Sequence, residues 1–307
     1  GENGLIQFDG TSWRCVTRKD GLADNRINTI FQDKNGYIWV GTDEGLSRYN
    51  NGTWTTFSQK DGLSCNTVLA IIEDKKGNIW VGTQTGGVCR FDEKNWVNYK
   101  QKDGLAGNTV YALLQDNEGI IWCGTSNGIS RYDGKNWITY KQRDGLAHND
   151  VRTLIQDNEG IIWIGTNNGG ISTFDDTCFQ SIDSRDGLIN DTVNCLYMDR
   201  NGYIWIGTEG GVMRFIPNKT PPVVYITRMI ADDTYTEPKG IISLKSNVRR
   251  LSFNYHAISF KTRPGGMKYF YQLIGHDDKW LGPINRENIE YFELEPREYT
   301  FQVRAVD

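Results

Sequence analysis

The sequence predicts an all-β protein, in which β-propeller blades are followed by a β-sandwich. Tryptophan recurs at steps of 41 and 42 residues, at Trp39, Trp80, Trp122, Trp163 and Trp205. The tripeptide Asp-Gly-Leu keeps the same step, starting at Asp20, Asp61, Asp103, Asp144 and Asp186. Two phased series of this length indicate a tandem array of one structural unit. The apolar runs are rich in β-branched and aromatic residues and lack helical periodicity, which excludes helical solenoids.

Each unit is predicted to contain four short antiparallel strands. In the second complete copy, the turn residues 74–77 and 84–87 separate apolar runs that read as strands, at 67–73, 79–83, 88–91 and 95–99. In the second of these strands, Ile79 and Val81 point to one side, whereas Trp80 and Gly82 point to the other. Both faces of the sheet therefore need cover, which neighbouring blades supply in a propeller. We expect Gly82 to leave room for an aromatic ring of the adjacent blade.

The strand count predicts about five blades in an arc or in part of a larger propeller. Residues 4–17 supply the last two strands of one blade, four complete blades follow, and residues 192–216 supply most of another. Closure into a small ring by pairing both ends is the alternative. We favour the arc because both ends supply a third strand. The chain starts at Gly1 and reads as a piece of a longer polypeptide.

A second domain is predicted from about residue 218. The period stops after Phe215, and three prolines mark the boundary, at Pro217, Pro221 and Pro222. We assign residues 1–217 to the propeller repeats and residues 218–307 to the sandwich. Apolar residues alternate with polar ones around 251–255, 269–273 and 299–305, which favours an immunoglobulin-like or fibronectin-like sandwich whose last strand is truncated at Asp307.

Composition and motifs exclude several functions. The formal charge of -4 over 307 residues gives no basic stripe for nucleic acid. No apolar run is long enough for a membrane span. The three histidines lie in no nucleophile motif and at no metal-ligand spacing, so we expect no cofactor, no metal and no enzymatic activity in this segment. The six cysteines include no CxxC pair and read as small buried hydrophobic residues.

Identical residues in every copy are interpreted as framework. The hairpin acids Asp33, Asp74, Asp116, Asp157 and Asp199 stand where a turn would satisfy its own backbone, and they lack the alternating acids of a calcium loop. The Asp-Gly-Leu loops are likewise read as turns leading into the next blade. In the second domain, Tyr269 and Tyr271 alternate with other residues along a strand, which places them in a core rather than in an aromatic surface that binds a sugar.

Positions that differ between copies are better candidates for recognition. The start of the innermost strand carries Asn28, Leu69, Tyr111, Arg152 and Asn194, and the loop after the second strand is expected at the same rim. The candidate ligand-binding residues are Asn28, Asp43, Glu44, Gln84, Tyr111, Asn127, His148, Arg152, Asn168 and Asn194. Amides, acids and an aromatic ring suit sugar hydroxyls and ring faces, and His148 with Arg152 would suit a uronate or a sulfate. For each residue singly, a solvated loop side chain is the alternative.

The repeat motif resembles the two-component regulator propeller repeat. The unit is built on Asp-x-x-Gly-x-x-Trp-x-Gly-Thr, then Gly-hydrophobic-x-(Arg or Thr)-(Tyr or Phe), and the first four copies end in Asp-Gly-Leu, over about residues 4–216. The segment with Tyr269-x-Tyr271-x-Leu273-x-Gly275 and Tyr299-x-Phe301-x-Val303 resembles the triple-tyrosine domain that accompanies those repeats. The family carries more blades than this chain, and its membrane helix and kinase are missing here.

The resemblance implies the periplasmic sensor of a Bacteroides-type hybrid two-component system, carried by an inner-membrane histidine kinase. It implies an oligosaccharide ligand, a homodimeric parent protein, and membrane attachment only through a downstream helix. Ligand binding would bias the arrangement of two subunits and pass through the sandwich. Two alternatives stay open: a propeller enzyme such as a polysaccharide lyase or glycosidase, and a protein-interaction scaffold.

Overall fold

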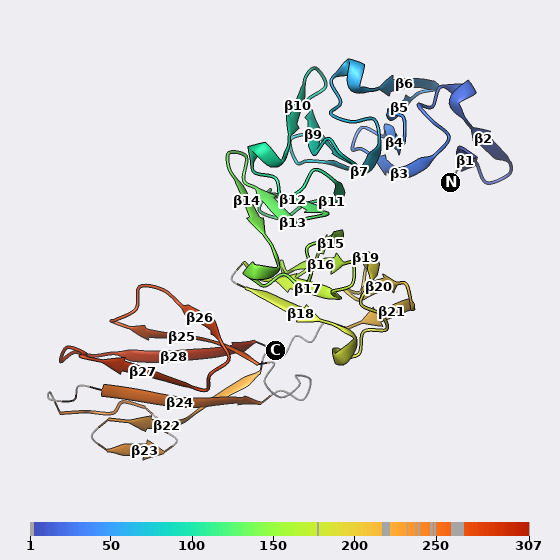
Figure 1. Cartoon of the computed structure of the whole chain (residues 1–307). Helices are drawn as coiled ribbons and strands as arrows, with labels where there is room; N and C mark the ends of the chain where they lie inside the picture. The colour runs from blue at the N-terminus through green and yellow to red at the C-terminus, as the bar shows by residue number, and fades with distance from the viewer. Residues whose placement is uncertain are drawn as a thin grey trace. The chain divides into compact units, whose positions relative to one another are not determined.

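The computed structural model contains two compact units, Gly1–Pro217 and Asn218–Asp307. It describes residues 3–176, 178–216, 222–231, 233–236, 238, 240–245, 248, 250–258 and 267–306. Within these residues the regular structure is strands and short 3-10 turns, as predicted (Figure 1).

Four complete blades form the middle of the first unit, each an antiparallel sheet whose strands follow in chain order. The first blade contains β3 (Ile27–Gln32), β4 (Ile38–Thr42), β5 (Leu46–Asn50) and β6 (Thr53–Phe57). The second contains β7 (Val68–Glu73), β8 (Ile79–Thr83), β9 (Val88–Phe91) and β10 (Trp96–Tyr99). The third contains β11 (Val110–Gln115), β12 (Ile121–Thr125), β13 (Gly128–Tyr132) and β14 (Trp137–Tyr140). The fourth contains β15 (Val151–Gln156), β16 (Ile162–Thr166), β17 (Ile171–Phe174) and β18 (Phe179–Ile182).

Incomplete blades stand at both ends of this array. The N-terminal one pairs β1 (Leu5–Phe8) with β2 (Trp13–Val16), and the C-terminal one contains β19 (Val193–Met198), β20 (Ile204–Thr208) and β21 (Gly211–Phe215). Figure 1 shows the innermost strands β3, β7, β11, β15 and β19 side by side on the concave side of an arc. Among the described residues no strand pairing joins β1 or β2 to β19, β20 or β21. The prediction of an arc is therefore confirmed.

The two faces of each blade pack against different neighbours, as the alternation predicted. Ile79 and Val81 of β8 share a core cluster with Trp39 of the first blade. Trp80, on the opposite face, shares a cluster with Val110 and Leu113 of the third blade. Trp39, Trp80, Trp122 and Trp163 of the repeat motif are each at most 4% exposed, whereas the equivalent Trp205 on the last blade is 39% exposed because no further blade covers it.

The glycine two residues after the tryptophan of each complete blade makes room for a valine, not for an aromatic ring as we expected. A Cβ added at Gly82 would lie 2.9 Å from Val110 Cγ1, and one at Gly165 would lie 2.7 Å from Val193 Cγ1. Each valine opens the innermost strand of the next blade. Since Cβ contacts this short do not occur in folded proteins, the glycine sets how closely two sheets approach.

The hairpin acids stabilise more than their own turn. Asp116 Oδ2 accepts a hydrogen bond of 2.7 Å from Trp122 Nε1, and its Oδ1 accepts one of 2.8 Å from the Ile120 backbone N–H. The same indole bond recurs at 2.7–2.9 Å in the other copies, from Trp39, Trp80, Trp163 and Trp205. Each carboxylate thus satisfies a polar atom of the tryptophan that seals the blade.

The carboxylate of the second hairpin makes stability depend on pH. Burial alone would raise the pKa of Asp74, but hydrogen bonds from Asn78 and Trp80 outweigh it and hold the pKa below its ordinary value. A lowered folded-state pKa stabilises the fold above the ordinary pKa of about 4, and this contribution is lost as pH falls through the folded-state pKa. The difference in urea midpoint between the wild type and Asp74→Asn should therefore be constant near neutral pH and shrink below about pH 4. A difference that does not change with pH would contradict this assignment.

Each blade is joined to the next by a 3-10 turn that ends in Asp-Gly-Leu. The turns are η1 (Arg18–Asp20), η2 (Gln59–Asp61), η3 (Gln101–Asp103), η4 (Gln142–Asp144) and η5 (Ser184–Asp186). The aspartate accepts a hydrogen bond from the backbone N–H three residues earlier, for example 2.8 Å from Ser58 to Asp61. The glycine that follows has φ between 103° and 111°, a region that favours glycine. The leucine is buried in every copy.

The second unit is a sandwich of two sheets, in the order β23-β22-β24-β27 and β26-β25-β28. Its strands are β22 (Val223–Ile230), β23 (Thr234–Thr236), β24 (Arg250–Ile258), β25 (Lys268–Ile274), β26 (Leu281–Ile284), β27 (Asn288–Phe292) and β28 (Thr300–Val306). Phe253 of one sheet stacks on Phe301 of the other at 4.0 Å between ring centroids. Tyr269 is 1% exposed and Tyr271 packs against the core, so both tyrosines lie where their alternation placed them.

The cysteine prediction is only half right. Cys89, Cys123 and Cys178 are buried, whereas Cys15 and Cys195 are exposed and Cys65 is intermediate. Cys15 lies on β2 and Cys195 on β19, in the two incomplete blades. A side chain that an adjacent blade would cover in the middle of the array is open at its ends.

Candidate ligand-binding rim

The candidate residues lie on one rim of the first unit, where the innermost strands start and where the second strand turns into the third. The loops there are held by bonds between consecutive blades. Thr109, before β11, donates from its hydroxyl to the Gln84 carbonyl at 2.6 Å, and Thr67 donates to the Asp43 carbonyl at 3.1 Å. The rim is therefore a continuous hydrogen-bonded band on which side chains can be positioned.

Tyr111 and Arg152 come together at the start of β11 and β15. The Arg152 guanidinium carbon lies 4.2 Å from the centroid of the Tyr111 ring, and Arg152 Nη2 lies 2.7 Å from Asp150 Oδ2. Asn167 Nδ2 donates to the same carboxylate at 3.0 Å. His148 accepts at Nδ1 from the Asp150 backbone N–H, at 3.2 Å. We call Tyr111, His148, Asp150, Arg152 and Asn167 the rim cluster.

Two polar atoms of the rim cluster, Arg152 Nε and Asp150 Oδ1, are buried and make no hydrogen bond within the described residues. Buried polar atoms are nearly always partnered in folded proteins. The pair offers one donor and one acceptor next to a partly exposed aromatic ring. The Asp150 carboxylate also offsets the Arg152 charge, so the cluster presents no unpaired cation on Arg152.

A smaller group forms at the first blade. Asn28 Nδ2 donates to Asp43 Oδ1 at 2.8 Å and to the Val68 carbonyl at 3.1 Å. Arg26 Nε lies 3.1 Å from Asp43 Oδ2. Asn28 and Asp43 are thus candidates that the structure brings together, but their side chains mainly tie the first blade to the second.

The remaining candidates are dispersed along the rim. Asn127 Nδ2 donates to the Ala106 carbonyl at 3.1 Å, and Asn168 Oδ1 accepts from Thr192 Oγ1 at 3.1 Å. Gln84 is held through its backbone. Glu44 and Asn194 are exposed.

Sequence comparison of the copies missed Asp150, the residue that binds both Arg152 and Asn167. The equivalent positions are Arg26, Thr67, Thr109 and Thr192, so an acid there differs from every other copy. That difference was the available signal. Among the described residues no group of three or more His, Cys, Asp or Glu could hold a metal ion. The described part of the chain also includes no helix of the length and hydrophobicity needed to cross a membrane.

The first unit is an arc of β-propeller blades, and comparison with known proteins identifies the repeat. The model of the two-component regulator propeller matches five segments, residues 21–44, 62–85, 104–127, 145–168 and 187–210. Each match runs from an Asp-Gly-Leu glycine to the loop after the second strand. The first unit is therefore built from two-component regulator propeller repeats. No match to the sequence was found among curated proteins.

Three solved structures share the fold. The extracellular domain assigned to the hybrid two-component system BT3049 of B. thetaiotaomicron is 22% identical, with a TM-score of 0.63, over 99% of this chain and 45% of that one. The extracellular domain assigned to the one-component system BT4673 of the same organism is 19% identical, with a TM-score of 0.58, over 100% and 56%. PorZ of Porphyromonas gingivalis, a surface component of a type-IX secretion system, is 16% identical, with a TM-score of 0.57, over 100% and 49%. The chain spans about half the length of these proteins.

Proposed function

We propose that this chain is a non-enzymatic, extracytoplasmic sensor segment of a hybrid two-component system, which binds an oligosaccharide on the propeller rim. The five matched repeats support the sensor class. The rim cluster carries the binding proposal, because it combines an aromatic ring, a paired cation and anion, and an amide at one place. The sandwich, as a triple-tyrosine domain, would pass the signal toward a membrane helix and a histidine kinase in a homodimeric parent protein.

The charges of the rim cluster favour sugar hydroxyls over an acidic group. A uronate or sulfate would need the Arg152 guanidinium, which Asp150 already engages at 2.7 Å. A hydroxyl can both donate and accept, so it suits Asp150 Oδ1 and Arg152 Nε together. The Tyr111 ring is only partly buried, and an aromatic ring suits the C–H face of a sugar ring.

Glycan binding by the purified chain tests the proposal. On an array of neutral, uronate-containing and sulfated oligosaccharides, we expect the chain to bind neutral glycans. Arg152→Ala and Tyr111→Ala should each weaken binding of the strongest array glycan at least about tenfold, as loss of one hydrogen bond to a charged group or one ring contact would. Calorimetry with that glycan measures the change.

Arg143→Ala is the matched control, because it removes the same charge from a side chain that is 80% exposed in η4. It should bind as the wild type does. If no glycan on the array binds, the binding proposal is contradicted. Recovery of one specific protein in a pull-down would then favour an interaction scaffold. Consumption of the bound glycan, abolished in the Arg152 variant, would favour an enzyme.

A further inference from the structure

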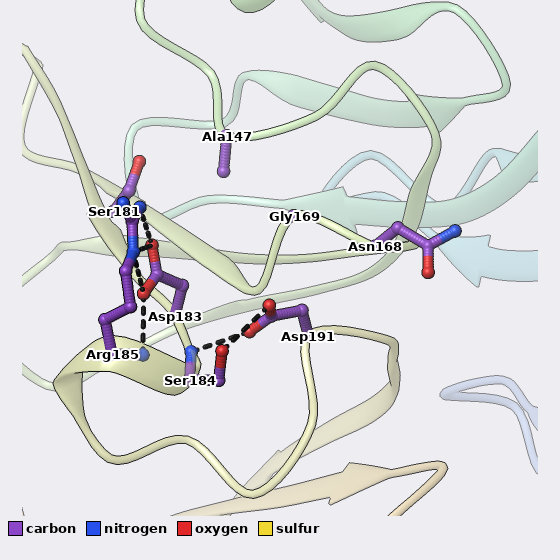
Figure 2. Close-up of a pocket in the computed structure, with 8 residues that line it drawn as sticks. All are labelled: Ala147, Asn168, Gly169, Ser181, Asp183, Ser184, Arg185 and Asp191. Carbon is purple, nitrogen blue, oxygen red and sulfur yellow. Dashed lines mark hydrogen bonds and ion pairs between the residues drawn. The ribbon is translucent and has the colours of Figure 1, made fainter.

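A polar pocket of about 440 Å³ lies at the junction of the fourth and fifth blades. It lies between Ala147, Asn168 and Gly169 on the side of the fourth blade and the turn that leads to β19. Figure 2 shows Asp183, Ser184 and Arg185 grouped at one side, with Asp191 pointing to Ser184 and the Ala147 side chain directed toward the group. The volume is in the range of small-ligand sites, roughly 300–1,000 Å³.

This junction differs from the other four at two lining positions. Asp191 stands where the others have Asn25, Asn66, Asn108 and Asn149, and Asp183 stands where they have Thr17, Ser58, Lys100 and Lys141. In every copy a side-chain oxygen at the position of Asp191 accepts a hydrogen bond from the equivalent backbone N–H. Asp191 accepts it from Ser184 at 2.7 Å, and Asn66 at the second junction accepts it from Gln59 at 2.9 Å. The turn therefore needs only one oxygen, and the second oxygen of Asp191 is additional.

The backbone opposite that turn is held in close approach. A Cβ on Gly169 would lie 2.5 Å from the Cβ of His148 and 3.0 Å from the Ala147 carbonyl carbon, so the loop after β16 packs directly on the segment before β15. Ala147 is small at this point. At the equivalent position before β19 the chain carries Ile189, whose Cγ2 would lie 2.8 Å from a Cβ on Gly210. One copy therefore carries a branched side chain at this position, in the last blade, where Ile189 is 51% exposed.

The lining offers both donors and acceptors. Asp191 Oδ2 accepts from Ser184 Oγ at 3.1 Å, and the guanidinium of Arg185 pairs with Asp183 while its side chain remains 73% exposed. The hydroxyls of Ser181 and Ser184 complete the polar set, whereas the Asn168 side chain points away from it (Figure 2). Two carboxylates against one guanidinium leave one net negative charge, which repels an anion.

We propose that this pocket is a second binding site, which takes a neutral monosaccharide unit through adjacent hydroxyls. Paired donors and acceptors match a vicinal diol, whereas an apolar ligand would find only Ala147 among the lining side chains. The choice of a sugar rests on the proposed function, but the site uses none of the rim-cluster residues. It would hold a chain end or a branch rather than the segment that contacts Tyr111.

The test is an NMR titration of the ¹⁵N-labelled chain with D-glucose, D-galactose, D-mannose and D-fructose, and with D-glucuronate and D-glucosamine as charged counterparts. At least one neutral sugar should shift the amide signals of Gly169, Ser184 and Asp191 saturably. Ala147→Ile should abolish these shifts by filling the pocket. Asp191→Asn keeps the acceptor for the Ser184 N–H and should weaken binding about tenfold, because an acceptor becomes a donor.

Ala23→Ile is the matched control, because Ala23 is the equivalent residue at the first junction. Its backbone N–H donates to Ser47 Oγ at 2.8 Å, as the backbone N–H of Ala147 donates to Ser172 Oγ. It should bind as the wild type does, and thermal unfolding checks that both isoleucine variants fold. Absence of shifts with every neutral sugar, shifts with D-glucosamine alone, or shifts that survive Ala147→Ile would each overturn the proposal. Arg152→Ala should leave these shifts unchanged, so failure of the rim site and failure of this pocket are distinguishable.

Discussion

Replacing Trp122 with alanine should lower the free energy of unfolding by about 3–5 kcal/mol, the usual cost of removing a large buried aromatic side chain. Trp122 is fully buried between the third and fourth blades. Its ring packs edge-on against Phe174, at 5.7 Å between ring centroids, and the Arg131 guanidinium lies over it. The truncation opens a cavity between two sheets and leaves Asp116 Oδ2 without its indole donor. Urea denaturation followed by circular dichroism measures the change.

Trp13→Ala is the control for this prediction. Trp13 lies in the incomplete N-terminal blade, is 72% exposed, and stacks on Phe8 at 4.4 Å. Its removal should change the free energy of unfolding by no more than about 0.5 kcal/mol. Equal losses for the two tryptophans would show that blade-to-blade packing does not determine the stability of the array.

Gly165→Val should cost up to about 3 kcal/mol through overpacking. A Cβ at this position would lie 2.5 Å from Thr153 Cγ2 in the same blade and 2.7 Å from Val193 Cγ1 in the next. Both neighbours are β-branched, and Val193 is fully buried, so neither side chain can rotate away easily. The fourth and fifth sheets would have to move apart. Thermal and urea unfolding report the loss.

Gly207→Val is the matched substitution at the end of the array. A Cβ there meets the Cys195 sulfur at 2.4 Å, but no valine of a following blade stands opposite. Cys195 is exposed and its thiol can rotate, so the cost should be at most about half that at Gly165. A larger loss at Gly207 would mean that the neighbour on the adjacent strand of the same blade, rather than the next blade, requires glycine.

The blades were predictable from the sequence because the determinants are local and repeated. The alternation of Ile79, Trp80 and Val81 specifies two buried faces, and five phased copies specify that neighbouring sheets cover them. The indole bond of Asp116 escaped the sequence analysis, although acid and tryptophan keep a spacing of six residues in every copy. A hairpin turn alone accounts for an aspartate at this position, so the second role of the carboxylate was not predicted.

The candidate site was less predictable because it depends on which copies lie next to one another. Tyr111 and Arg152 were found through differences between equivalent positions, but Asp150 was passed over since it precedes the strand by one residue. Cys15 and Cys195 show the same limit, because their exposure depends on being at the ends of the array and not on their local sequence. The pocket beside Ser184 was not predicted, because it forms where two loops approach each other in the folded structure.

Each connection runs from the outermost strand of one blade to the innermost strand of the next. This affects how such proteins can gain or lose blades in evolution. Since every sheet is completed by one contiguous stretch of about 41 residues, a duplicated or deleted stretch recreates the same valine-against-glycine contact at its new border. Genes can therefore gain or lose whole copies without redesigning any interface.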